Sequence, residues 1–107
     1  MQKYEKVYNV TSVEQFSNVP NVYKLEQNYP NPFNPSTKIR FSLKQAENVK
    51  LTVYNILGQE VAVLLNGYIS AGTHFVDFNA NNLASGIYIY NIQTQNFSAV
   101  KKMMLLR

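Results

Sequence analysis

The sequence lacks cysteine and tryptophan, and it contains only one histidine and one aspartate. Without cysteine the chain has no disulfide, no thiolate metal ligand and no cysteine nucleophile, although this says nothing about its compartment. No apolar run is long enough to span a membrane, and the Met1 end has no apolar run of signal-peptide length. We therefore expect either a cytoplasmic protein or a piece of a longer secreted one.

The few acidic and basic side chains form no catalytic or metal-binding pattern. His74 and Asp77 lie three residues apart in a predicted strand, so their side chains point to opposite faces and cannot act as a catalytic pair. The other carboxylates are dispersed without metal-ligand spacing, and the glycines form no phosphate-binding loop. We predict no enzyme, no cofactor and no metal, and we interpret His74 as a packed or capped strand residue.

Basic residues outnumber acidic ones by ten to six, which gives a net charge of +4. They are scattered, and only Lys101 and Lys102 are adjacent, whereas a nucleic-acid surface shows a denser basic stripe. We therefore predict no nucleic-acid binding. Apolar residues make up 46% of the 107 residues and include eight Tyr and six Phe, which is enough for one hydrophobic core.

The pattern of Val49–Leu65 predicts a β-hairpin. Hydrophobic residues alternate with polar ones up to Tyr54, and the alternation resumes after Glu60. Asn55 and Gly58 suit the first and last positions of a type I turn, with Gly58 at positive φ closing a three-residue loop. The side chains expected in the core are Leu51, Val53, Val61 and Val63.

Two apolar residues, Ile56 and Leu57, stand at the tip of this hairpin, where polar residues are usual. One interpretation is that they fold down as a lid over one end of the core. The other is that they form an exposed docking patch. We favour the lid.

Three prolines fall within the segment Leu25–Ser36, at Pro30, Pro32 and Pro35. Proline fixes φ, lacks a backbone donor and forces the preceding residue into extended geometry, so this segment is predicted to be stiff and non-helical. We expect Tyr29 and Phe33 to anchor it to the sheets. An irregular edge segment is favoured over an aromatic recognition loop.

Further short alternating segments indicate an all-β protein. They are separated by Gly, Asn and Pro, and no convincing helical pattern occurs, which predicts an antiparallel β-sandwich. Both faces of Ile87–Ile92 are apolar, so this strand is expected to be central, and Gly86 is expected to allow close packing at its start. The expected strands are Thr37–Leu43, Thr73–Phe78 (after the loop glycine Gly72), Ile87–Ile92 with Tyr88, Tyr90 and Ile92 inward, and Phe97–Arg107.

Three stretches together resemble one family. LEQNYPNPFNPSTKIRF (Leu25–Phe41), VYNILGQEVAV (Val53–Val63) and LASGIYIYNI with the final KKMMLLR (Leu83–Ile92 and Lys101–Arg107) look like the C-terminal sorting domain of type IX secretion substrates, a family of Bacteroidetes and their relatives. The resemblance implies an Ig-like antiparallel β-sandwich of about seven strands, residues 25–107, after a lead-in, residues 1–24, from an upstream domain. The Ig-like domain of flagellar hook-capping proteins is a related alternative, but it lacks the basic ending.

The resemblance also implies partners and a location. These are an upstream cargo domain in cis, the type IX machinery of the outer membrane, and a sortase-like peptidase that removes the domain and anchors the cargo. The protein is then secreted or held at the cell surface after passing the periplasm. No catalytic residue is carried over.

We expect the recognised part of the domain to lie in the last strand, at Lys101, Lys102, Met103, Leu105 and Arg107. A C-terminal strand is expected at a sheet edge, where strand addition and charge pairing can read it. The alternative is a purely structural role, in which Met103–Leu106 completes the sandwich and the two lysines prevent aggregation at the sheet edge. A different function, an Ig-like adhesion or carbohydrate-binding module, would be supported by exposed aromatics such as Tyr54, Tyr68 and Phe75 on one face.

Overall fold

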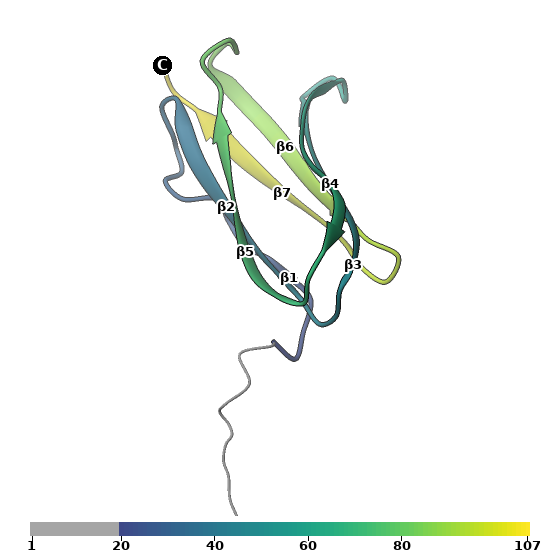
Figure 1. Ribbon diagram of the computed structural model, residues 1–107. Coiled ribbons are helices and arrows are strands. Elements are labelled where there is room, and N and C mark those ends of the chain that lie inside the picture. The colour runs from purple at the N-terminus through teal and green to yellow at the C-terminus, as the bar shows by residue number, and fades with distance from the viewer. Residues whose placement is uncertain (1–19) are drawn as a thin grey trace, which may run out of the picture.

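A computed structural model describes residues 20–107 of the chain, and these form seven strands in two antiparallel sheets (Figure 1). The three-stranded sheet has the order β1-β2-β5 and the four-stranded sheet the order β4-β3-β6-β7. Over the described residues no helix is long and apolar enough to cross a membrane. The strands are β1 Lys24–Leu25, β2 Ser36–Leu43, β3 Glu47–Asn55, β4 Glu60–Ile69, β5 Gly72–Asn79, β6 Gly86–Gln93 and β7 Ser98–Leu105.

The core lies between the two sheets and is built by strands with regular alternation. In β2 every second residue, Ile39, Phe41 and Leu43, has no exposed surface, and these side chains face the inward residues of β3 and β6. β6 pairs with β3 on one side and with β7 on the other, so it is central, as its sequence predicts. The inward residues of β6 are the expected ones, Tyr88, Tyr90 and Ile92.

β4 is the strand in which the predicted alternation fails. Leu51 pairs with Leu65, but the next residue of β3, Thr52, pairs with Val63, so one extra residue is accommodated in β4 as a bulge. A second bulge lies between the pairs that Ala62 and Glu60 make with β3. A bulge reverses the facing of the residues beyond it. Leu51 and Val53 are buried as expected, but the expectation is wrong for Val63, which is 44% exposed, and Val61 is only partly buried.

The hairpin tip has the predicted turn but not the favoured orientation. Gly58 has a φ of 82°, and its N–H donates to the Asn55 carbonyl oxygen at 3.0 Å. The Asn55 side-chain oxygen also accepts hydrogen bonds from the Leu57 and Gln59 amides, and these bonds fix the loop conformation. Ile56 and Leu57 are 71% and 79% exposed, so the lid interpretation is wrong and the tip presents two apolar side chains to solvent.

Gly86 is required by its backbone conformation and not by close packing. Its φ is 150°, and a Cβ atom placed on it would meet no atom within 4 Å. The expectation of a close approach at this position is therefore wrong. Gly72, at the start of β5, likewise has a positive φ of 126° and open space around it.

The proline segment crosses from one sheet to the other. Phe33 is buried and Tyr29 is exposed, so only one of the two expected anchors enters the core. Tyr29 pairs instead with Lys38 at the edge of β2, and Phe33 pairs with Leu105 of β7. The predictions made for residues 1–19, which form most of the expected lead-in, lie outside the described residues.

Candidate functional site

The last strand, β7, lies at the edge of the four-stranded sheet, as expected. Its side chains alternate strictly, so Met103 and Leu105 are buried in the core. Lys101 and Lys102 point to opposite sides of the sheet and do not form a joint basic patch. The outer strip of β7, as we name it, consists of Val100, Lys102 and Met104, all of which are exposed.

The outer backbone edge of β7 is already occupied over its C-terminal half. The Phe33 N–H donates to the Met104 carbonyl oxygen at 2.9 Å, and the Leu106 N–H donates to the Phe33 carbonyl oxygen at 3.0 Å. The Asn31 side chain accepts from the Met104 N–H, and the Gln27 side chain donates to the Lys102 carbonyl oxygen. The expectation of free donors and acceptors along this edge is therefore wrong from Lys102 onward.

Tyr90 links the two sheets beside this edge. Its side chain comes from β6, and its hydroxyl donates to the Glu26 carbonyl oxygen at 2.7 Å and accepts from the Asn28 N–H at 2.8 Å. Asn28 is itself buried, and its side chain donates to the Pro30 carbonyl oxygen and to the Thr37 hydroxyl. Burial raises the pKa of the Tyr90 phenol to about 12.

Arg107, the last residue, is held by backbone carbonyl groups. Its Nη1 donates to the carbonyl oxygens of Ala80, Asn81 and Leu83 at 2.8–3.1 Å, and its own N–H donates to the Ser85 hydroxyl. The guanidinium thus fastens the loop between β5 and β6 to the chain end. Five residues are expected from the sequence to form the surface that the secretion machinery recognises. Among them, Lys102 alone is exposed and has no side-chain contact that holds another part of the domain in place.

A polar cluster at the other end of the molecule fixes the start of the domain. The Tyr23 hydroxyl donates to the Glu47 carboxylate, and the Tyr23 ring stacks on Phe97 with centroids 5.2 Å apart. The hydrogen bond from Tyr23 lowers the pKa of the Glu47 carboxyl, and the same bond raises the pKa of the Tyr23 phenol. The chain is therefore attached to the sandwich from Tyr23 onward.

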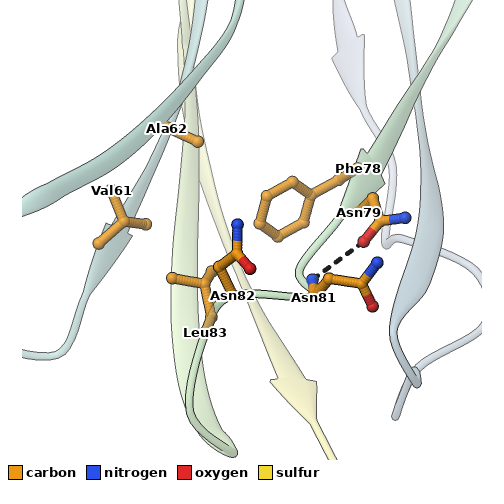
Figure 2. A pocket seen from close by; sticks show the side chains of 7 residues that line it. All are labelled: Val61, Ala62, Phe78, Asn79, Asn81, Asn82 and Leu83. Atoms are coloured by element: carbon orange, nitrogen blue, oxygen red, sulfur yellow. Dashed lines mark hydrogen bonds between the residues drawn. The ribbon is translucent and has the colours of Figure 1, made fainter.

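A cleft lies on the opposite side of the sandwich, between β4 and the end of β5. Figure 2 shows Val61 and Ala62 on one side of it, and Phe78 and Leu83 facing them. The amides of the Asn79–Asn82 turn lie at its rim, and its volume is about 390 Å³. No charged side chain lines it, which gives it no means of acid–base chemistry.

His74 and Asp77 both make structural contacts. The His74 ring lies 5.4 Å from the Phe41 ring and forms a hydrogen bond with the Ser70 carbonyl oxygen, which confirms a packed and capped histidine. Asp77 points to the other face of β5 and pairs with Lys38. Within residues 20–107, no three His, Asp or Glu side chains come together in a group that could hold a metal ion.

The aromatic residues of the alternative adhesion module do not share a face. Tyr54 and Tyr68 belong to β3 and β4 of the four-stranded sheet, whereas Phe75 belongs to β5 of the three-stranded sheet. Tyr54, Tyr68 and Phe75 therefore do not form one aromatic surface, since the two sheets present opposite outer faces.

Residues 27–106 match the family model of the secretion system C-terminal sorting domain. The chain belongs to this family. No curated protein matches the chain. The matched range takes in most of the proline segment and all of β7, and with them the backbone hydrogen bonds that Phe33 makes with Met104 and Leu106.

Sorting domains of this family are C-terminal signals for type IX secretion, so the protein is exported through the periplasm to the cell surface or beyond. Such a signal is a non-catalytic kind of domain.

Sequence reasoning missed Val100 and Met104 as exposed neighbours of Lys102. The period-two alternation of β7, once Leu105 is placed inward, puts all three on the outer face.

Proposed function

We propose that this domain directs a larger cargo protein, attached before it, through the type IX machinery and across the outer membrane, and that it acts by binding and not by catalysis. The family match over residues 27–106 carries this proposal. Residues 25–107 form the sorting domain in this scheme, and residues 1–24 lead in from the cargo.

We place the recognised surface on the outer strip of β7. Val100 is 59% exposed and Met104 is 37% exposed, and they flank Lys102 on the same face at a spacing of two residues. A lysine between two exposed apolar side chains suits a partner surface that offers a carboxylate within an apolar patch. Met103 and Leu105 contribute by holding the strand in the core, because their own side chains are buried.

After transport, a sortase-like peptidase removes the domain and the cargo is anchored or released. Tyr23 is already packed against Glu47 and Phe97, and peptidases need an extended, unpacked substrate. We therefore place the cut in the lead-in, before Tyr23.

Export of a reporter tests the proposal. A signal peptide and a reporter protein are fused before residues 1–107, and the exported fraction is measured in a host with type IX secretion. Lys102→Gln is compared with Lys101→Gln, which removes the same charge from the neighbouring residue on the opposite side of the sheet. We expect Lys102→Gln to reduce export and Lys101→Gln to leave it near the wild-type level.

Two controls separate the role of the outer strip from the role of the whole domain. Purified variants are unfolded in urea to show that both retain the wild-type fold. If both folded variants are exported like the wild type, the outer strip is not the recognised surface. If the reporter is exported without residues 25–107, the domain is not a sorting signal at all.

A further inference from the structure

The outer face of the three-stranded sheet carries two exposed aromatic rings. Tyr29 is 81% exposed and Phe75 is 62% exposed. Tyr29 pairs with Lys38 of β2, and Phe75 stands opposite Arg40 of the same strand, so both rings flank the two basic residues of β2. The Arg40 guanidinium carbon lies 5.7 Å from the centroid of the Phe75 ring, so one face of that ring is covered and the other remains open for a ligand. With neighbouring strands ~4.8 Å apart and residues ~3.4 Å apart, the rings lie on the order of 10 Å from each other.

Two adjoining hollows accompany these rings. One, of about 350 Å³, lies between Tyr29, Pro30 and Asp77 and is mostly apolar. The other, of about 200 Å³, lies between Tyr29, Arg40 and Phe75. Tyr29 and Lys38 line both hollows, so the hollows adjoin at these two side chains, and we call them together the groove.

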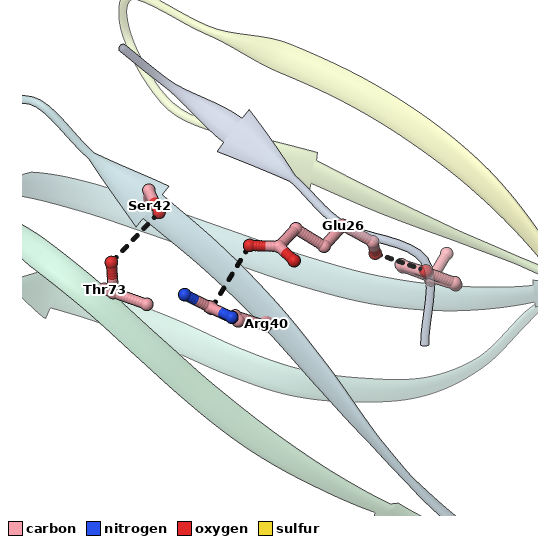
Figure 3. Close-up of polar contacts among 5 residues, drawn as sticks. Glu26, Arg40, Ser42 and Thr73 are labelled. Atoms are coloured by element: carbon pink, nitrogen blue, oxygen red, sulfur yellow. Dashed lines mark hydrogen bonds and ion pairs between the residues drawn. The ribbon is translucent and has the colours of Figure 1, made fainter. Parts of the chain in front are cut away.

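The four charged side chains on this face form two ion pairs, and these pairs engage only some of their hydrogen-bonding atoms. Lys38 Nζ lies 2.7 Å from the Asp77 carboxylate, and Arg40 Nε lies 3.1 Å from the Glu26 carboxylate, a pair that Figure 3 shows across the surface of β2. Each pair engages one nitrogen and one oxygen, whereas a guanidinium has five N–H donors and each carboxylate has two oxygens. The groove therefore offers spare donors and spare acceptors with no net charge.

We infer that this face binds a neutral oligosaccharide. Sugar rings present C–H groups on one side, which pack on the negative face of an aromatic ring, and hydroxyl groups at the rim, which both donate and accept hydrogen bonds. Two rings beside two small hollows, with unused donors and acceptors between them, match successive sugar units. A charged ligand would have to compete with one member of each ion pair.

The size of the groove favours a saccharide over a protein. A stable protein interface covers on the order of 800 Å² on each partner and has an apolar centre with few charges. Here four charged side chains occupy the centre and the apolar rings lie at the sides. The groove is also on the sheet opposite to the outer strip of β7, so saccharide binding and sorting use separate surfaces.

Direct binding tests the inference without any secretion step. The full chain is titrated by calorimetry and by NMR with a panel of neutral hexasaccharides: cellohexaose, laminarihexaose, xylohexaose, mannohexaose and maltohexaose. Hexagalacturonic acid serves as the charged probe. We expect saturable binding of at least one neutral member, with the largest amide shift changes at Tyr29, Lys38 and Phe75.

Three alanine variants locate the site. Tyr29→Ala and Phe75→Ala are each expected to weaken binding roughly tenfold, the factor that corresponds to 1.4 kcal/mol. Tyr68→Ala is the matched control, because Tyr68 is 70% exposed but lies on the other sheet, and it is expected to bind like the wild type. The inference is overturned if no neutral member binds saturably, if the charged probe binds more tightly, if both ring variants bind normally, or if Tyr68→Ala loses as much affinity.

Discussion

The sandwich has two sides at which the edge of one sheet meets the edge of the other, and these two sides differ in the contacts that join the sheets. We call the side formed by residues 23–33 and β7 the closed seam, and the side formed by β4 and β5 the open seam. At the closed seam, hydrogen bonds run from Gln27, Asn31 and Phe33 to β7, and the Tyr90 hydroxyl ties the next strand to the same segment. Across the open seam, the described residues include no backbone hydrogen bond between β4 and β5.

The composition of each seam explains the difference. Proline has no N–H, so the segment at the closed seam cannot form a regular ladder and uses Asn and Gln side chains for the missing donors and acceptors. At the open seam, β4 is bulged twice, and bulges twist an edge away from further pairing. One seam is closed by polar contacts, whereas the other stays open as the cleft between Val61 and Phe78.

The largest expected effect comes from truncating Phe33 at the closed seam. Its ring is 2% exposed, and it lies 6.0 Å from the Phe78 ring, so Phe33→Ala leaves a cavity between the sheets. We expect a loss of about 3–5 kcal/mol in the free energy of unfolding, measured in urea. Val61→Ala, on the open seam, is expected to lose only about 1 kcal/mol.

Equal losses in these two variants would break the comparison. They would mean that the open seam is packed as tightly as the closed one, despite the cleft beside Val61. The urea m-value should stay unchanged in both, because neither substitution alters the surface exposed on unfolding by much.

The second prediction concerns the Tyr90 hydroxyl. Tyr90→Phe leaves the Asn28 N–H and the Glu26 carbonyl group without their partner near the core, and we expect a loss of about 1–3 kcal/mol. The control is Tyr88→Phe, because the Tyr88 hydroxyl serves one carbonyl group, that of Ala84, which lies in an exposed loop. A loss in Tyr88→Phe as large as that in Tyr90→Phe would show that the closed seam gains nothing from its polar link.

The same phenol predicts a dependence on alkaline pH. Burial raises the pKa of folded Tyr90 to about 12 from 10.0, so the folded state favours the protonated form. The resulting stability is present below pH 10 and is lost as the pH rises toward 12. We expect the free energy of unfolding of Tyr90→Phe to fall less over this interval than that of the wild type, measured by urea unfolding at a series of pH values.

The sequence predicts the strands whose pattern is regular. β2 alternates apolar and polar residues without interruption, and in β6 the polar Asn91 marks the outer face, so the side chains that the two patterns place inward are the buried ones. β4 has equally apolar residues, but a bulge leaves no local mark in a run such as Val61–Leu65, where every residue is hydrophobic. The reversed facing of Val63 therefore could not be read from the sequence.

The candidate site was predicted only in part, because its decisive contacts are distant in sequence. The position of β7 at a sheet edge follows from its place at the end of the chain, but the cover over that edge comes from Asn31 and Phe33, more than seventy residues earlier. Likewise the charge of Arg107 is visible in the sequence, whereas the three carbonyl groups that hold it come together only in the fold.

The fourth prediction separates the charge of Arg107 from its geometry. Arg107→Lys keeps the charge, but a lysine offers a single nitrogen on a flexible stem in place of a planar guanidinium. We expect a loss of about 1 kcal/mol in the free energy of unfolding, because the loop carbonyl groups lose a shared donor. Near wild-type export of this variant would show that recognition does not need the guanidinium geometry, while failed export of a stable variant would give that geometry a role in recognition.

The smallest expected effect lies at the start of the closed seam, where Tyr23 donates to the Glu47 carboxylate. This bond lowers the pKa of folded Glu47 below 4.5, so the folded state favours the ionised form. The resulting stability is present above the unfolded pKa and is lost as the pH falls through the folded one. Tyr23→Phe removes the donor, and urea unfolding at pH 7 and pH 3 should therefore show a smaller fall for this variant than for the wild type. Tyr68→Phe, on the exposed face of β4, should keep the full acid dependence. If Tyr23→Phe kept it as well, the lead-in would not be attached through Glu47, and the closed seam would begin only at the proline segment.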